Sequence, residues 1–198
     1  MKRSRDEKTL ERIYERDKQS GAFIISVAIE KYPDIFNELD SAPWRRRDLD
    51  HDLRVFLEES SSDIPLRYDI TLQFNVSQEK QDVEKEDRIR TGLRTYFSFV
   101  RNSLQRDIRL SYQKSALYGL GSFLLLFTSY SLQARVLGNL FLTTLVDVIS
   151  IGGWVFLWEA ISTFAFKSRE SREMYRQYKR LTVAPVRFYY YGHEPDSA

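Results

Sequence analysis

Two long apolar segments, separated by a short polar break, dominate the hydrophobic pattern of this chain. The first covers residues 115–132 and the second residues 136–166, with residues 133–135 between them. About 18 or more apolar residues in a helix are long enough to cross the ~30 Å hydrocarbon core of a bilayer. The pattern therefore predicts a transmembrane hairpin with spans at residues 115–132 and about 139–166. The alternative is a buried helical pair in a soluble protein, although residues 124–127 (LLLF) and 154–158 (WVFLW) leave no polar face for water.

The second apolar segment is longer than a membrane requires. Its residues would measure about 46 Å as a helix, which exceeds the thickness of the bilayer core. The helix is therefore expected to tilt, to project beyond the bilayer or to begin in the interface. Gly152 and Gly153 predict a kink or a close helix contact within it. Gly119 and Gly121 are the corresponding helix-packing candidates in the first segment.

Alternating polarity predicts a small sheet outside the hairpin. In residues 66–76 (LRYDITLQFNV) apolar and polar side chains alternate, which is typical of a strand with one dry and one wet face. Residues 22–29 are a second candidate, for which a helix stays open, and residues 183–191 are a third. Pro185 places the third strand at a sheet edge, or the strand starts after Pro185. Strands from both sides of the hairpin are expected to complete one sheet.

Helical patterns accompany these strands. Asp48 or Asp50 caps a helix that runs through Glu59 and ends at the serines of residues 60–62.

A longer helix is predicted directly before the first span. Residues 84–114 carry an apolar stripe at helical spacing and, apart from Gly92, contain no glycine or proline. Residues 167–181 also lack glycine and proline, so both spans are expected to continue as helices into the water-facing domain. Movement or assembly of that domain would then pass directly to the spans; a fixed stalk is the alternative.

The predicted fold class is α+β, with a two-helix transmembrane hairpin inserted into a small cytoplasmic domain of about three strands packed on helices. The expected organisation is a cytoplasmic domain at residues 1–114 ending in a long amphipathic helix, the hairpin at 115–166, a returning helix and final strand at 167–191, and a disordered tail at 192–198.

Basic residues set the expected orientation of the hairpin. Lys and Arg cluster on both of its flanks, whereas the connecting residues 133–135 hold Arg135 alone. Because Lys and Arg near span ends stay on the cytoplasmic side, both termini are predicted to face the cytoplasm, with the hairpin in the plasma (inner) membrane. The first 18 residues lack the apolar core of a cleavable signal peptide.

Composition excludes several chemistries. The chain has no cysteine, so disulfides, thiolate nucleophiles and cysteine-based zinc sites are excluded. His51 and His193 are the only histidines, too few for a multi-histidine metal site, and the net charge of +2 is too small to indicate nucleic-acid binding. Phosphate-loop, dinucleotide, serine-hydrolase and zinc-protease motifs are missing, so we expect no enzyme, no cofactor and no metal. His51 is interpreted as part of a helix start.

Asp147 and Glu159 are the main candidate functional residues, because they lie inside the second apolar segment. A carboxylate near the membrane centre costs roughly 2.5–3.5 kcal/mol, so such residues normally face protein or water. The two lie about 18 Å apart along a helix and ~120° around it, which does not specify one ion path. A homo-oligomer would give each carboxylate its own ring, as in cation pores, whereas a partner membrane subunit is the rival explanation. The alternative places both residues at the interfaces, with Asp147 free to pair with Arg135.

An arginine cluster is a second candidate site. Trp44, Arg45, Arg46 and Arg47 precede the helix capped near Asp48. Arginines beside a helix start bind phosphate, either on a nucleotide or on a lipid headgroup. A solvated loop or an internal ion-pair cluster is the alternative.

The leading functional hypothesis is an oligomeric integral membrane protein whose cytoplasmic domain senses a ligand or partner and controls a pore or membrane disruption. The expected partners are membrane lipid, further copies of the chain, and a cytoplasmic protein or anionic nucleotide. The layout resembles that of small bacterial membrane effectors in which a cytoplasmic sensing domain controls a short hairpin, and this resemblance of architecture implies a role in antiviral defence. A non-enzymatic anchor that recruits a cytoplasmic partner is the alternative, and an accessory transporter subunit is the third hypothesis.

Overall fold

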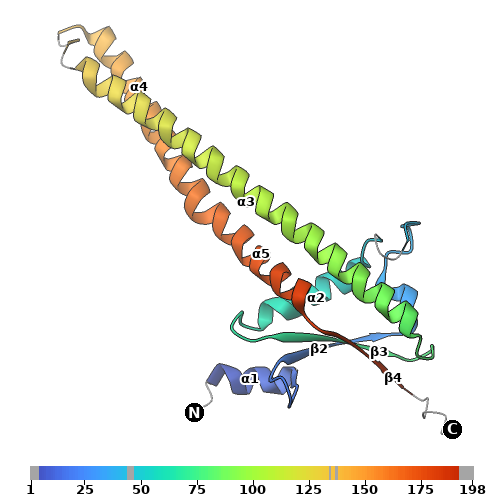
Figure 1. The fold of residues 1–198 in the computed structure, drawn as a ribbon. Coiled ribbons are helices and arrows are strands. Elements are labelled where there is room, and N and C mark those ends of the chain that lie inside the picture. Colours follow the sequence, from blue (N-terminus) through green and yellow to red (C-terminus); the bar gives the residue numbers. More distant parts are fainter. Residues whose placement is uncertain (1–4, 44–46, 134, 137, 192–198) are drawn as a thin grey trace, which may run out of the picture. The chain divides into compact units, whose positions relative to one another are not determined.

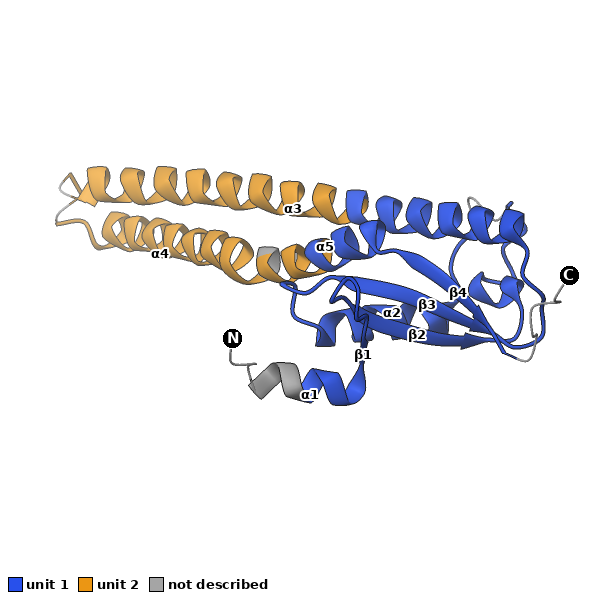
Figure 2. Cartoon of the chain, turned by 60° about the horizontal axis from the view of Figure 1, so that its bottom comes forward, with its two compact units in different colours: residues 1–102, 176–198 blue, residues 103–175 orange. Residues whose placement is uncertain are grey.

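The chain divides into two compact units. The computed structural model describes residues 5–43, 47–133, 135–136 and 138–191 (Figure 1). Unit 1 comprises residues 1–102 and 176–198, and unit 2 comprises residues 103–175 (Figure 2). The tail predicted to be disordered, residues 192–198, lies outside the described residues.

Unit 1 is built on a four-stranded mixed sheet with the order β1-β2-β3-β4. Strands β2, β3 and β4 run parallel, and β1 pairs antiparallel with β2. The register places Leu72 of β3 opposite Ile25 of β2 and Val186 of β4. The strands are β1 Glu15–Arg16, β2 Phe23–Ile29, β3 Ile70–Val76 and β4 Val186–Tyr190. One sheet therefore joins segments from both sides of the hairpin, as predicted.

Two of the three predicted strands are confirmed, β2 within one residue of its predicted bounds and β4 as a shorter strand inside the predicted residues 183–191. Residues 23–29 form a strand and not a helix, and β4 begins immediately after Pro185 at the sheet edge. The third begins at Ile70, later than predicted, because the Tyr68 N–H donates to the Pro65 carbonyl (3.0 Å) and holds a turn there. The short strand β1 was not predicted, since two residues are too few to show an alternating pattern.

Helix α2 (His51–Asp63) confirms one predicted boundary and corrects the other. The carboxylate of Asp50 caps it, accepting hydrogen bonds from the N–H groups of Asp52 (3.0 Å) and Leu53 (3.1 Å). The predicted end at Glu59 is wrong, because the helix continues through three serines to Asp63. Ser60 and Ser61 are buried against the rest of unit 1, so tertiary contacts override their weak helix propensity.

One face of the sheet carries most of the core of unit 1. Helix α2, the 3₁₀ turn η1 (Tyr32–Ile35) and the unit 1 portions of α3 (Val83–Gln133) and α5 (Ser168–Val183) cover that face (Figure 1). The helix α1 (Arg5–Ile13) precedes the sheet and was not predicted. The largest fully buried side chains include Phe23, Ile25, Tyr32, Ile35, Phe36, Leu57, Leu72, Phe74, Ile89 and Leu93.

Helix α3 is a single α-helix of 51 residues that contributes to both units. This confirms the prediction that the amphipathic segment before the first apolar segment continues into it without a break. Its first turns are anchored in unit 1, where Ile89, Leu93 and Phe97 are buried.

Unit 2 contains the second half of α3, helix α4 (Leu140–Ser162), the π-helical turn η2 (Thr163–Lys167) and the start of α5. Helix α4 begins later than the apolar segment does. Gly138 adopts a left-handed conformation (φ 97°) and the Asn139 side chain accepts a hydrogen bond from the Leu142 N–H (3.2 Å), so the connection is longer than residues 133–135. Two helical stretches, Val83–Gln133 and Leu140–Val183, are long and apolar enough to cross a membrane.

Candidate functional site in the helical hairpin

Three serines connect the two helices of unit 2, and we refer to them as the serine ladder. Their hydroxyls donate to backbone carbonyls of the facing helix: Ser115 to Ala160 (2.7 Å), Ser122 to Gly153 (2.8 Å) and Ser129 to Val146 (3.0 Å). Donors recur every seven residues along α3, and acceptors recur every seven along α4. Seven residues make about two helical turns, so the same faces meet at each step of an antiparallel pair.

The serine ladder lies in the interior of the hairpin. Ser122 is 1% exposed and Ser129 is 3% exposed, and the facing Val146, Gly153 and Ala160 are buried. A buried hydroxyl without a partner is costly, and each of these has one. Small residues at such positions let two backbones approach closely, which is the way helices pack in lipid.

Gly153 lies where the two helices approach each other closely. A Cβ at this position would lie 2.7 Å from Leu126 Cγ and 3.2 Å from the Leu126 backbone nitrogen. The other predicted packing glycines are less crowded. A Cβ on Gly121 would touch Phe156 at 3.6 Å, one on Gly152 would touch Leu125 at 4.0 Å, and one on Gly119 would meet nothing within 4 Å. Helix α4 continues through Gly152 and Gly153, so the close contact is observed there and the helix is not interrupted.

Asp147 and Glu159 lie away from the serine ladder. Each is six positions from Gly153, so they project about 120° to either side of the face that meets α3. Both are exposed in the single chain. Glu159 accepts a hydrogen bond from the Thr163 hydroxyl (3.4 Å), and among the described residues Asp147 makes no ion pair with Arg135. The hairpin therefore does not bury either carboxylate.

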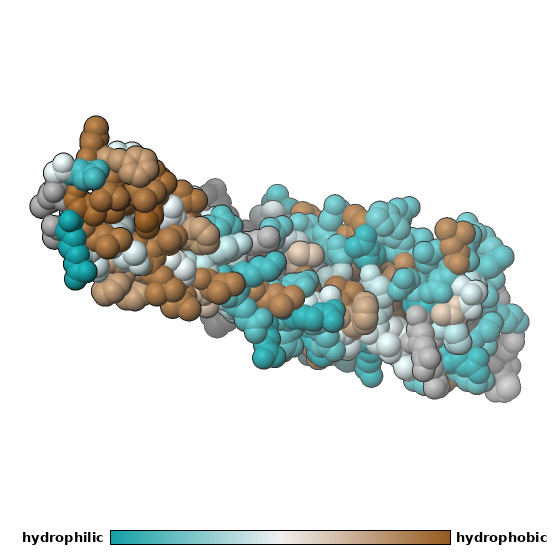
Figure 3. Space-filling model, turned by 90° about the horizontal axis from the view of Figure 1, so that it is seen from above, coloured by the Kyte–Doolittle hydropathy of each residue, from teal (hydrophilic) through white to brown (hydrophobic). Residues whose placement is uncertain are grey.

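An apolar surface covers the outside of the hairpin. Trp154 is 57% exposed, Trp158 is 69% exposed and Phe123 is 63% exposed. Figure 3 shows hydrophobic residues gathered over the surface of the hairpin. Other exposed members are Leu124, Phe127, Leu145, Val148, Ile151, Val155, Ile161 and Phe164. Soluble monomers rarely expose contiguous apolar patches above a few hundred Å².

Unit 1 holds a buried carboxylate near the start of α3. The Tyr190 hydroxyl donates to Glu86, and Arg90 donates to the other oxygen of Glu86 (2.7 Å). The hydroxyls of Tyr32 and Tyr190 lie 2.6 Å apart. Burial raises the pKa of Tyr190, and its bond to Glu86 raises that pKa further. The network connects η1, α3 and β4.

A second polar network fixes the return of the chain into unit 1. The Arg180 guanidinium of α5 donates to the carbonyls of Ile64 (3.0 Å), Pro65 (3.1 Å) and Tyr68 (3.2 Å) and to the hydroxyl and carbonyl of Ser61. Arg180 is 8% exposed, and burial lowers the pKa of its guanidinium. These bonds tie α5 to the end of α2 and the turn before β3.

Nearby, the Tyr178 hydroxyl of α5 donates to the Glu58 carboxylate of α2. Burial raises the pKa of Tyr178, and the bond to Glu58 raises it further.

Of the predicted arginine cluster, the structure describes Arg47 alone, because Trp44, Arg45 and Arg46 lie outside the described residues. Arg47 Nε donates to the Ala42 carbonyl (3.1 Å), and this hydrogen bond stabilises the loop that contains both residues. Two backbone hydrogen bonds, from Ala42 and Asp48, lower the pKa of the neighbouring Asp40. Phosphate binding at this loop stays a prediction.

Sequence reasoning missed two features that the structure places at these sites. The serine ladder was visible in principle as Ser115, Ser122 and Ser129, a seven-residue repeat inside an apolar segment. Arg180 gave no local signal, since its partners lie more than 110 residues earlier in the chain.

Fold and site together define an α+β protein that carries a long antiparallel helical hairpin, with three serine–carbonyl hydrogen bonds between its helices and an apolar exterior. No protein-family model, curated protein or solved structure matches the chain. Among the residues that the structure describes, no group of three or more His, Asp or Glu side chains is placed to hold a metal ion.

Proposed function

We propose that this chain is a two-span membrane protein that self-associates through its hairpin and whose unit 1 senses a ligand or partner in the cytoplasm. The observation that carries the proposal is the distribution of polar and apolar side chains on the hairpin. The hydroxyls of Ser122 and Ser129 are paired inside, and aromatic and aliphatic side chains cover its outside. In water this arrangement would expose a large apolar surface. In lipid the apolar side chains face hydrocarbon, and the serine hydroxyls keep their hydrogen bonds inside the hairpin.

The orientation follows from charge. Lys and Arg are abundant before and after the hairpin, and the connection near its tip holds only Arg135. The positive-inside rule then places both termini and unit 1 in the cytoplasm, with the hairpin in the plasma (inner) membrane.

Self-association is supported by the two carboxylates. Asp147 and Glu159 project from the outer faces of α4, where a lone hairpin would present them to lipid. The serine ladder and Gly153 bring the two helices into direct contact, so one hairpin leaves no path for ions between them. Several hairpins around an axis can direct either carboxylate to a shared, hydrated interior, as in cation-selective pores.

The continuity of helix α3 supports control of the hairpin by unit 1. Helix α3 passes from residues anchored in unit 1 to residues of the hairpin with no helix break. A flexible linker would be rich in Gly and Ser, and α3 has no such segment at this point. A ligand-dependent rearrangement of unit 1 is therefore expected to act on the hairpin through this helix, opening a pore or disturbing the membrane, as in the bacterial defence effectors that the layout resembles.

The pore proposal is tested by ion flux from liposomes containing the purified chain. We expect cation flux that falls in the Asp147→Asn and Glu159→Gln variants, with a lower cation-to-anion permeability ratio. Asp107→Asn is the matched control, because this exposed carboxylate of α3 precedes the apolar segment. Flux that is unchanged in both hairpin variants, or equally reduced in the control, would contradict the proposal.

A non-enzymatic anchor is the second candidate function. It is favoured by a cavity in unit 1 that runs along strand β2 and is lined by Val27, Ile29 and Phe56. In that case the hairpin serves attachment alone, and partner recruitment persists when Asp147 and Glu159 are neutralised together.

A further inference from the structure

Strand β2 has an open edge along most of its length. Strand β1 pairs only with Phe23 and Ile24, so the edge beyond them has no neighbouring strand. Natural sheet edges usually carry charges, prolines or bulges that prevent pairing with other chains. The residues 25–29 (ISVAI) carry no charge and no proline.

The backbone groups of Ser26 and Ala28 face this open edge. The Phe23 N–H donates to the Asp69 carbonyl (2.9 Å), and the Ile29 carbonyl accepts from the Ser77 N–H (3.1 Å). Odd-numbered residues of β2 therefore direct their backbone groups toward β3, and even-numbered ones direct them to the other side. Among the described residues, no hydrogen bond from the Ser26 or Ala28 backbone is found.

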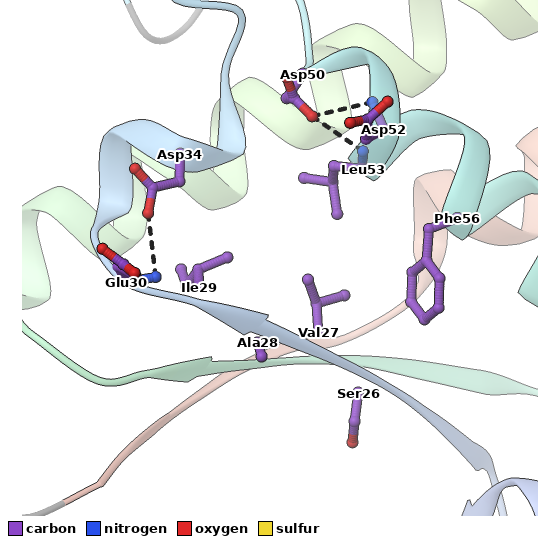
Figure 4. Close-up of a pocket in the computed structure, with 10 residues that line it drawn as sticks. All are labelled: Ser26, Val27, Ala28, Ile29, Glu30, Asp34, Asp50, Asp52, Leu53 and Phe56. Atoms are coloured by element: carbon purple, nitrogen blue, oxygen red, sulfur yellow. Dashed lines mark hydrogen bonds between the residues drawn. The ribbon is translucent and has the colours of Figure 1, made fainter.

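A cavity of about 570 Å³ runs along the same edge, between β2, η1 and α2 (Figure 4). Its apolar lining includes Val27 and Ile29 from β2 and Leu53 and Phe56 from α2. Phe56 is 44% exposed although it is a large aromatic residue. The cavity thus combines unpaired backbone groups with an apolar surface beside them, which is the arrangement that strand-adding peptides use.

The charged residues that line the cavity are all acidic. They are Glu30, Asp34, Asp50 and Asp52. Asp50 caps α2, and Asp34 accepts from the N–H groups of Glu30 and Lys31, so these two already have partners. The carboxylates of Glu30 and Asp52 make no ion pair among the described residues.

We propose that the open edge of β2 binds an extended segment of a partner protein in which basic and apolar side chains alternate. The segment adds a strand beside β2 and pairs with the four backbone groups of Ser26 and Ala28. Its apolar side chains enter the cavity, and its basic side chains meet Glu30 and Asp52. Pairing of β2 with β2 of a second copy is disfavoured, because it would bring the two acidic rims together. The site lies within unit 1 and does not depend on pore formation.

The test uses the full chain in phosphatidylcholine nanodiscs and a fluorescent six-residue peptide of alternating lysine and valine. We expect saturable binding by anisotropy, with slowed amide hydrogen exchange at Ser26 and Ala28. A glutamate–valine peptide and a backbone N-methylated lysine–valine peptide are expected to bind at least about tenfold more weakly, since they remove the charge match and the main-chain bonds respectively.

Variants of the chain provide a second arm. The double change Glu30→Gln and Asp52→Asn is expected to weaken lysine–valine binding by about tenfold or more. Glu59→Gln is the matched control, because Glu59 is an exposed carboxylate of α2 that does not line the cavity. Equal binding of the acidic peptide, or binding without protection of Ser26 and Ala28, would overturn the proposal. Protection that rises with protein concentration in the absence of peptide would also overturn it, by assigning the edge to a second copy.

Discussion

The serine ladder leads to a quantitative prediction for the stability of the hairpin. Replacing Ser115, Ser122 and Ser129 together with alanine removes three interhelical hydrogen bonds and leaves the backbone unchanged. Interhelical side-chain hydrogen bonds in membranes average about 0.6 kcal/mol each. The triple variant should therefore lose about 2 kcal/mol, which is roughly a 30-fold shift in the folding equilibrium.

Tryptophan fluorescence during SDS titration of the protein in mild detergent measures this loss. Two of the three tryptophans, Trp154 and Trp158, lie in α4, so a Trp44→Phe background confines the signal to the hairpin. Thr128→Ala is the control, because Thr128 is exposed on the same helix and should change stability by less than about 0.5 kcal/mol. A triple-variant loss below about 0.5 kcal/mol, or an equal loss in the control, would refute the role assigned to the ladder.

Three further predictions concern packing, the buried arginine and pH. Gly153→Ala should destabilise the hairpin by about 1–3 kcal/mol relative to Gly119→Ala in the same titration. Both variants gain helix propensity, but only the new methyl group at position 153 meets Leu126. Equal stabilities of the two variants would contradict this contact. Arg180→Met should lower the unfolding free energy of unit 1 by about 3 kcal/mol or more, because buried carbonyls lose a charged donor. Denaturant unfolding followed by circular dichroism measures this loss, and a near-neutral result would refute the stabilising role of Arg180. The raised pKa of Tyr190 means that the folded state keeps a proton which the unfolded state releases near pH 10, so stability should be full below pH 10 and fall as pH rises above it. Tyr190→Phe should flatten that alkaline decline, and an unchanged slope would show that Tyr190 does not contribute.

Some elements of unit 1 were predictable from local sequence pattern, and others depend on tertiary contacts. Strand β2 and the start of α2 at Asp50 were predictable, because side-chain periodicity and capping act over a few residues. The far end of α2 was not, since Ser60 and Ser61 are held in the helix by burial, and Ser61 by its bonds to Arg180.

The sequence by itself determined the two apolar helices, the unbroken course of α3 and the participation of β4 in the sheet. These depend on hydrophobic length, on the absence of proline from α3, and on alternation, which are properties of neighbouring residues. Tertiary structure alone decided that Ser122 meets Gly153, that Asp147 and Glu159 project away from that contact, and that β2 keeps an open edge. Each of these follows from the register between segments distant in the chain, and no single segment encodes that register.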